Sequence, residues 1–163
     1  MKEFRLELKW ALIFTVMTLL WMAGEKAAGL HDRYLDKHLI LTNLIAIPSL
    51  VIYYLAMHEK KRSFYGGSMS FKEGMRFGLV MSLMIALLAP LTQYVISTWI
   101  SPQYFPDIIR MVVEQRKMTH EQAEAYFSLG NYMKQSAYGS LIMGIVTSAI
   151  MAAILKSRGQ NPA

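Results

Sequence analysis

The chain has 163 residues, of which 54% are hydrophobic and 17% are charged, and its formal net charge is +6. A typical soluble domain has about 45–50% apolar and about 25% charged residues, so this composition excludes an ordinary water-soluble globule and a disordered chain. The chain has no cysteine. This excludes a disulfide framework, a thiolate metal site and a cysteine nucleophile.

Apolar segments long enough to cross a bilayer, which takes about 20 residues, occur at four places. They cover residues 8–28, 38–57, 75–100 and 136–155. The first also resembles a secretory signal peptide, but Glu25 and Lys26 lie in the approach to any cleavage site, so we expect a retained helix. The few remaining residues cannot bury these segments in a soluble core. We therefore predict an all-α membrane protein with one four-helix transmembrane domain over residues 1–156.

Residues 101–135, between the third and fourth spans, are too amphipathic for a bare loop. Thr119 with Gln122 fits a capping box, as Ser70 with Glu73 does before the third span. We predict two short helices in this segment, which lie on the membrane interface or cover the ends of the bundle. A short cytoplasmic tail, residues 157–163, follows the fourth span.

The distribution of charge predicts the orientation. When the amino terminus is placed in the cytoplasm, the whole net charge of +6 falls on the cytoplasmic side. Both termini and residues 58–76 then lie in the cytoplasm, and we predict a multi-pass protein of the bacterial inner membrane. Lys60, Lys61 and Arg62 are expected to contact anionic lipid headgroups. The basic composition thus reflects topology and predicts no nucleic-acid partner; the expected partners are membrane lipids and another envelope membrane protein or a second copy of the chain.

Small residues recur every four positions on the third and fourth spans, a pattern that lets helix backbones approach closely in lipid. The set comprises Gly78, Ser82 and Ala86 on the third span and Ser140, Gly144 and Ser148 on the fourth. We expect a tight helix pair within one chain, with a contact between two copies as the alternative. No serine lies in a nucleophile-elbow motif. We therefore predict no catalytic residue and no enzyme activity.

Polar residues at a shared depth, near the outer ends of the spans, are candidates for a ligand site. This polar layer comprises Glu25, Asn43, Thr92, Gln93 and Ser140. It could bind a ligand or ion, or it could only hydrogen-bond the helices together. We predict that Glu25 points into the bundle and hydrogen-bonds a residue of another span or of the first outer loop.

The first outer loop contains His31, Asp32, Asp36 and His38. This group could hold a cation. However, no histidine pair has the helical spacing of a zinc motif. We therefore expect a solvated loop, and predict neither a metal nor a cofactor.

Several strings have a familiar order along the chain. They are Tyr65-Gly66-Gly67-Ser68-Met69-Ser70-Phe71, Pro90-Leu91-Thr92-Gln93-Tyr94 and Lys117-Met118-Thr119. Together they resemble a bacterial integral-membrane family called domain of unknown function 4199. The resemblance covers nearly the whole chain and implies four helices in the cytoplasmic membrane. It implies no activity, cofactor or catalytic residue; the proximity of such proteins to polyprenyl-phosphate glycosyltransferases in genomes implies a role in envelope assembly.

These features favour a non-enzymatic accessory or scaffold subunit of the bacterial cell envelope. The alternative is a small oligomeric transporter or lipid-handling protein that uses the polar layer. Pro48 and Pro90 support this alternative, because prolines bend helices near the mid-membrane sites of many transporters.

Overall fold

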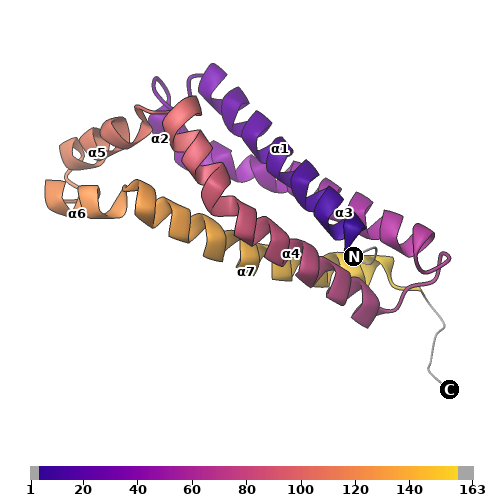
Figure 1. The fold of residues 1–163 in the computed structure, drawn as a ribbon. Coiled ribbons are helices and arrows are strands. Elements are labelled where there is room, and N and C mark those ends of the chain that lie inside the picture. Colours follow the sequence, from indigo (N-terminus) through magenta and orange to yellow (C-terminus); the bar gives the residue numbers. More distant parts are fainter. Residues whose placement is uncertain (1–3, 158–163) are drawn as a thin grey trace.

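The computed structural model describes residues 4–157, and the regular secondary structure in that range is all helical, with no strand. The elements in order are α1 (Arg5–Ala27), α2 (Leu35–Leu41), the 3-10 helix η1 (Thr42–Ile45), α3 (Ala46–Ser63), α4 (Phe71–Val95), the π-helix η2 (Ile96–Ile100), α5 (Tyr104–Glu114), α6 (His120–Tyr126) and α7 (Leu129–Leu155). Figure 1 shows α1, α4 and α7 as long rods, with α5 and α6 together at one end. Most of the expected tail, residues 158–163, lies outside the described residues.

Three of the described helices are long and apolar enough to cross a membrane: α1, the 30-residue helix formed by α4 and η2, and α7. The segment predicted as the second span, residues 38–57, is not among them. It is divided between α2, η1 and α3, and the last turns of α3 carry a run of charged residues. The prediction of an all-α, membrane-like protein is confirmed, with three candidate spans by this measure.

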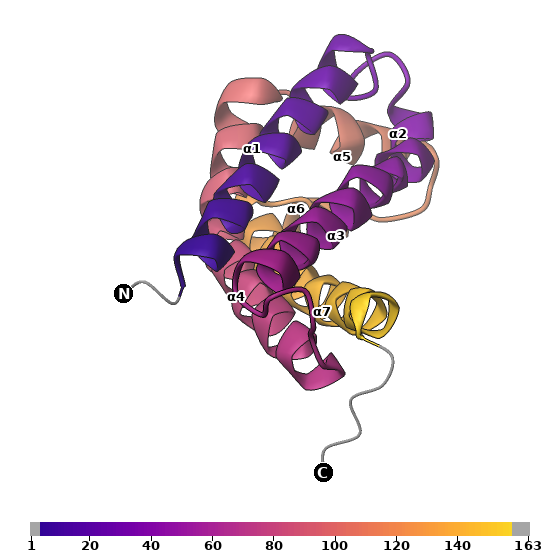
Figure 2. The ribbon, with the colours of Figure 1, turned by 90° about the vertical axis from the view of Figure 1, so that its right-hand side faces the viewer.

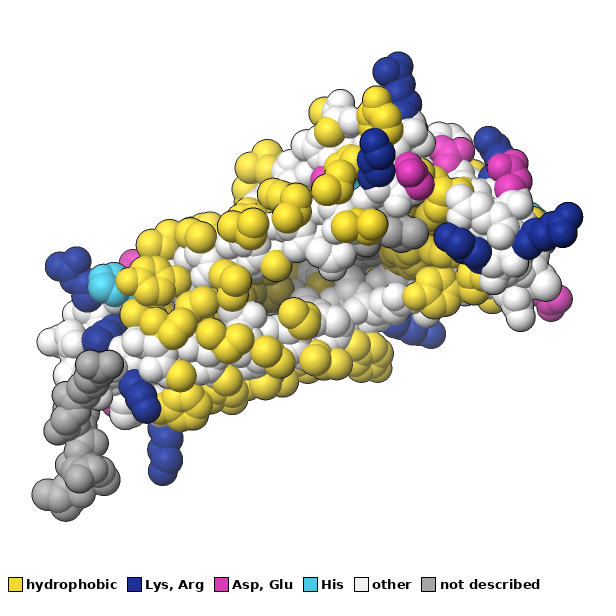
Figure 3. Space-filling view, turned by 180° about the vertical axis from the view of Figure 1, so that it is seen from behind, with side chains coloured by type: hydrophobic (Ala, Val, Ile, Leu, Met, Phe, Trp, Pro, Cys, Tyr) yellow, Lys and Arg dark blue, Asp and Glu magenta, His cyan; other side chains and the backbone are white. Residues whose placement is uncertain are grey.

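The surface of the helical body is apolar. Leu20, Leu87 and Leu91 are 68%, 72% and 62% exposed. Figure 3 shows hydrophobic side chains along the body, and Lys and Arg gathered at its two ends. Exposed apolar surface of this extent is unfavourable in water but is what a lipid environment accepts.

Both expected capping boxes are present at helix starts. The Ser70 hydroxyl accepts from the backbone N–H of Glu73, whose carboxylate accepts from the Ser70 N–H at 2.7 Å. Thr119 and Gln122 form the same reciprocal pair at the start of α6. Helix α4 therefore begins at Phe71, four residues before the start that hydrophobicity predicts for this span, because the capping box and not the apolar run sets its first turn.

Helices α4 and α7 lie side by side in both Figure 1 and Figure 2. The hydroxyl oxygens of Ser82 and Ser148 are 3.4 Å apart, and the Tyr53 hydroxyl of α3 lies 2.9 Å from Ser82 Oγ. A Cβ atom at Gly78 would overlap the Ser148 side chain, and one at Gly144 would lie 2.7 Å from the Tyr53 hydroxyl. The small side chains thus let three helices meet at one level.

A second, smaller core lies at the end of the body. Leu35 of α2 packs there with Ile108 and Val112 of α5, Ala123 of α6 and Phe127, which directly follows α6. The amphipathic segment therefore folds on itself and onto α2. We call α5, α6 and the residues that join them the cap, and the opposite end of the body, where α3 ends and α4 begins, the basic end.

Replacing Gly144 by Leu is expected to separate α4 from α7, because the new side chain would overlap Ser82 and Tyr53. We expect a loss of about 1–3 kcal/mol in the free energy of unfolding, as for overpacked cores. Gly139→Leu is the matched control on the same helix, because nothing lies within 4 Å of a Cβ atom there. Equal melting temperatures of the two variants in detergent would contradict this packing.

Candidate metal centre

Three polar side chains from different elements meet at the cap end of the body. Glu25 comes from the last turns of α1, His31 from the following loop and His38 from α2; they are 5%, 1% and 6% exposed. Glu25 Oε2 lies 3.3 Å from Nε2 of His31 and 3.2 Å from Nε2 of His38. Because buried polar groups need partners within the protein, this cluster is stabilised by its own members.

The remaining polar atoms of the cluster face other residues. The Trp21 indole donates to Glu25 Oε1 at 2.6 Å. His31 Nδ1 lies 2.5 Å from the Ser101 hydroxyl, and His38 Nδ1 lies 3.4 Å from the Tyr104 hydroxyl. Each of the three side chains is therefore fixed by one outward contact, while Nε2 of both histidines and Oε2 of Glu25 converge.

A tight reversal after α1 brings His31 back to Glu25. Gly29 has φ +78°, a left-handed conformation that glycine adopts without strain. The N–H of Leu30 donates to the Glu25 carbonyl and that of Gly29 to the Lys26 carbonyl, each at 3.0 Å. This is the Schellman pattern of helix termination. An ion pair of 2.9 Å between Lys26 and Asp32 holds the loop on its exposed side.

The electrostatics favour a neutral His31. Burial lowers the pKa of its imidazole below the usual value, and the charges of His38 and Lys26 act in the same direction, against the opposing effect of Glu25. A neutral imidazole has a lone pair to offer, which is the form that binds metal ions. One ligand atom from each of Glu25, His31 and His38 lies within 4.8 Å of the others, so the group is a candidate metal centre.

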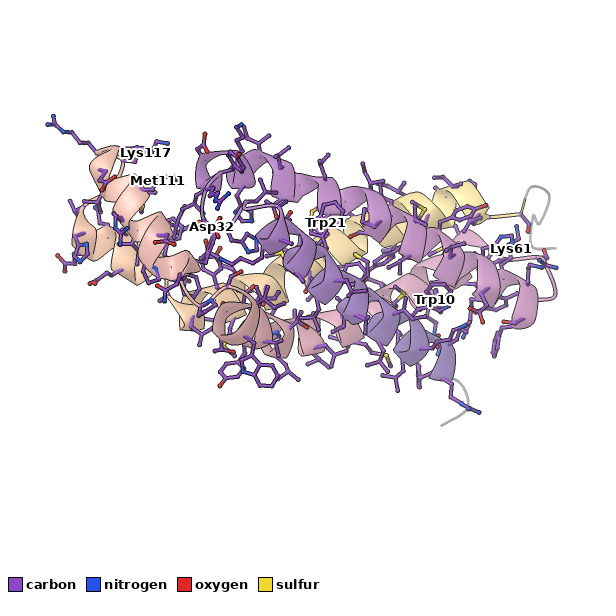
Figure 4. The ribbon with its side chains drawn as sticks, turned by 90° about the horizontal axis from the view of Figure 1, so that it is seen from above. Trp10, Trp21, Asp32, Lys61, Met111 and Lys117 are labelled. Carbon is purple, nitrogen blue, oxygen red and sulfur yellow. The ribbon has the colours of Figure 1, made fainter. Side chains whose placement is uncertain are left out.

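The expectation of a solvated first loop was therefore wrong for its histidines. His31 and His38 are buried, while Asp32 and Asp36 are exposed. The two histidine side chains of this segment therefore point into the protein, and the two aspartate side chains point to its surface. Helical spacing could not reveal the cluster, because its members come from two helices and the Gly29 turn. A useful signal was the presence of three ionisable residues close to the end of an apolar span. In Figure 4, Trp21 and Asp32 lie toward the cap, which carries Met111 and Lys117.

The other residues of the predicted polar layer do not join this cluster. Thr92, Gln93 and Ser140 line a cavity of about 130 Å³ between α1, α4 and α7, together with Thr15, Thr18 and Ser136. Asn43 is exposed in η1, where its amide donates to the Ile40 carbonyl at 3.2 Å. The structure thus divides the layer into the Glu25 cluster, the cavity residues and Asn43.

The three basic residues at the end of α3 have different environments. Lys60 is 5% exposed, and its ammonium group lies 2.9 Å from the buried Glu7 carboxylate of α1. The expected contact of Lys60 with lipid headgroups is therefore wrong, because its side chain faces the body. Lys61 donates to the Leu155 carbonyl at 2.8 Å and is half-buried, while Arg62 is exposed.

Removing the Glu25 carboxylate is expected to destabilise the protein. Glu25→Leu leaves the Trp21 indole and the two imidazoles without their acceptor, and an unsatisfied buried donor costs about 1–3 kcal/mol. Glu25→Gln retains one acceptor oxygen and should lose less. Thermal unfolding in detergent with a chelator tests this, with the exposed Glu114→Leu as control, expected within about 0.5 kcal/mol of the unmodified chain. Equal stabilities of Glu25→Leu and Glu114→Leu would contradict the prediction.

Comparison with characterised proteins and with solved structures found no match for this chain. Comparison with protein families found one described as "protein of unknown function (DUF4199)", which matches residues 9–157. The matched range contains the Glu25 cluster, the helix pair and the cap, and it agrees with the resemblance inferred from the sequence. The chain therefore belongs to the DUF4199 family of proteins of unknown function.

Proposed function

We propose that the protein is a non-enzymatic accessory or scaffold subunit of the bacterial cell envelope, which presents its cap to another envelope protein. The observation that supports this most is a groove of about 580 Å³ on the cap. Its lining includes the apolar side chains of Phe105, Ile109 and Val113 and charged side chains of both signs. Such a combination of apolar and mixed charged groups is typical of protein interfaces, where an apolar centre has a polar rim.

The sequence explains why the groove is available. In α5, Ile108 and Val112 are buried in the small core beneath the cap. Ile109 and Val113 follow them by one position and are half-buried. Because α5 is apolar on more of its surface than its own core covers, a partner that fills the groove would bury additional apolar area.

We place the protein in the cytoplasmic membrane with four crossings and both termini in the cytoplasm. The start of α1, the loop between α3 and α4 and the end of α7 lie at the same end of the body, which supports an even number of crossings (Figure 1). Residues 39–57 contain no charged residue. Ile40, Ile47 and Val51, which lie in this segment, are 74%, 62% and 51% exposed, as expected for a lipid-facing surface.

A second candidate function, the handling of a lipid or small polar solute, is supported by the cavity between α1, α4 and α7. Thr92, Gln93 and Ser140 give it hydrogen-bonding groups at a level where the surrounding surface is apolar. Such groups within a membrane body are typical of solute or headgroup sites.

The partner hypothesis can be tested by photocrosslinking in cells. A photoreactive amino acid at Ile109, in the groove, is expected to give one discrete adduct with another envelope protein. The same amino acid at Gln115, which is exposed on the cap outside the groove, should give none. Adducts with phospholipid alone would contradict the scaffold proposal and favour lipid handling, and an adduct with a second copy would identify self-association.

The orientation can be tested with single cysteines, because the chain has no native cysteine. A thiol reagent that does not cross membranes is added to intact spheroplasts, where it reaches only the outer face of the inner membrane. It is expected to label Lys117→Cys on the cap and to spare Arg62→Cys at the basic end. Both positions are exposed, so a difference reports sidedness. Labelling of Arg62→Cys before permeabilisation would contradict cytoplasmic placement of this end.

A further inference from the structure

We propose that Glu25, His31 and His38 bind one divalent transition-metal ion, for which Zn²⁺ is the best fit. This inference depends on the geometry of the cluster and on no part of the function proposed above. Two imidazoles and one carboxylate are a known zinc donor set, and three protein ligands leave a fourth position for water or another ligand.

The distances within the cluster fit such an ion. Zinc bonds of about 2.0–2.1 Å in a tetrahedral arrangement place neighbouring ligand atoms about 3.3 Å apart. Glu25 Oε2 lies 3.3 Å and 3.2 Å from the Nε2 atoms of His31 and His38. The imidazole rings are nearly perpendicular to each other, at 85° with centroids 4.7 Å apart, and each directs its Nε2 atom to Glu25 Oε2.

The surrounding contacts have the form that metal sites require. A ligating histidine usually hydrogen-bonds a second partner through its other ring nitrogen, which fixes the ring orientation. Here the Ser101 hydroxyl lies at Nδ1 of His31 and the Tyr104 hydroxyl at Nδ1 of His38. The Trp21 indole holds the Glu25 oxygen that does not face the histidines. All three proposed ligands therefore have a positioning partner.

The hydroxyls of Ser101 and Tyr104 can hydrogen-bond the two histidines both with and without the ion. Without a metal, the Nε2–H groups donate to Glu25, and the hydroxyls of Ser101 and Tyr104 donate to Nδ1. With a metal on Nε2, each proton resides on Nδ1 and is donated to the hydroxyl oxygen. Serine and tyrosine hydroxyls are both donors and acceptors, so each can pair with its Nδ1 atom in either state.

The position of the site suggests what the ion does. Its ligands come from α1, the following loop and α2, while Ser101 and Tyr104 lie after η2 and in α5. A bound ion would therefore tie the body to the element that begins the cap. Because a ligand that binds the folded state stabilises it, Zn²⁺ should raise the melting temperature of the protein.

Direct metal titration tests the proposal. The full chain, carrying a tag without histidine and freed of metal by a chelator, is titrated with Zn²⁺ in detergent against a chromophoric competitor. We expect one Zn²⁺ per chain. Glu25→Gln and His38→Gln should each lower the affinity by at least about 100-fold, and Tyr104→Phe, which removes the hydroxyl at His38 Nδ1, by about 10-fold.

His120→Gln is the matched control. His120 forms an exposed pair with Glu124 on the cap, and its replacement should leave the affinity unchanged. Co²⁺ gives a second readout on the unmodified chain, because four-coordinate Co²⁺ absorbs visible light much more strongly than hydrated Co²⁺. This readout holds even if a ligand variant fails to fold.

Two results would overturn the proposal. One is that the unmodified chain binds neither Zn²⁺ nor Co²⁺ in stoichiometric amount. The cluster would then be only a hydrogen-bonded contact between helices. The other is binding that persists in the folded Glu25→Gln and His38→Gln variants but is lost in His120→Gln, which would place the metal on the cap surface. Stronger binding of Mn²⁺ than of Zn²⁺ would contradict the choice of ion, since imidazole ligands favour zinc.

Discussion

Polar side chains inside an apolar body must find partners within the protein, and the architecture of this chain depends on that constraint. Helices in lipid gain little from apolar contact with each other, so close packing and polar contacts determine which helices associate. The described residues provide such contacts at three levels of the body. These are Glu7 with Lys60 at the basic end, Tyr53 with Ser82 and Ser148 in the middle, and Glu25 with His31 and His38 at the cap end.

The three levels connect different parts of the fold. The basic-end pair joins α1 to α3, and the middle contacts join α3 to α4 and α7, where small residues allow the backbones to approach. The cap-end cluster joins α1 to α2 and, through Tyr104, to α5. The cap is therefore attached to the body by polar contacts as well as by its small core. This attachment positions the proposed partner surface and the proposed ion site relative to the body.

Local features of the fold could be predicted from the sequence. Three such features depend on residues only a few positions apart, so they can be recognised along the sequence. They are the capping box at Ser70, the four-residue spacing of small residues that includes Gly78 and Gly144, and the amphipathic pattern of α5 and α6. Burial of Lys60 and His31 could not be predicted, because each depends on a partner brought in by another element. Hydrophobicity also suggested one continuous helix over residues 38–57, where the chain instead forms η1 between α2 and α3.

Buried polar pairs between helices are expected to hold the body together, and a double-mutant cycle on Glu7→Gln and Lys60→Met measures the strength of one such pair. The cycle compares unfolding free energies of the two single variants and the double variant in lipid nanodiscs. Removing one member of a buried pair leaves the other without its oppositely charged partner, so the losses should not be additive. We expect a coupling energy of at least about 1 kcal/mol. Additive losses within about 0.3–0.5 kcal/mol would contradict it.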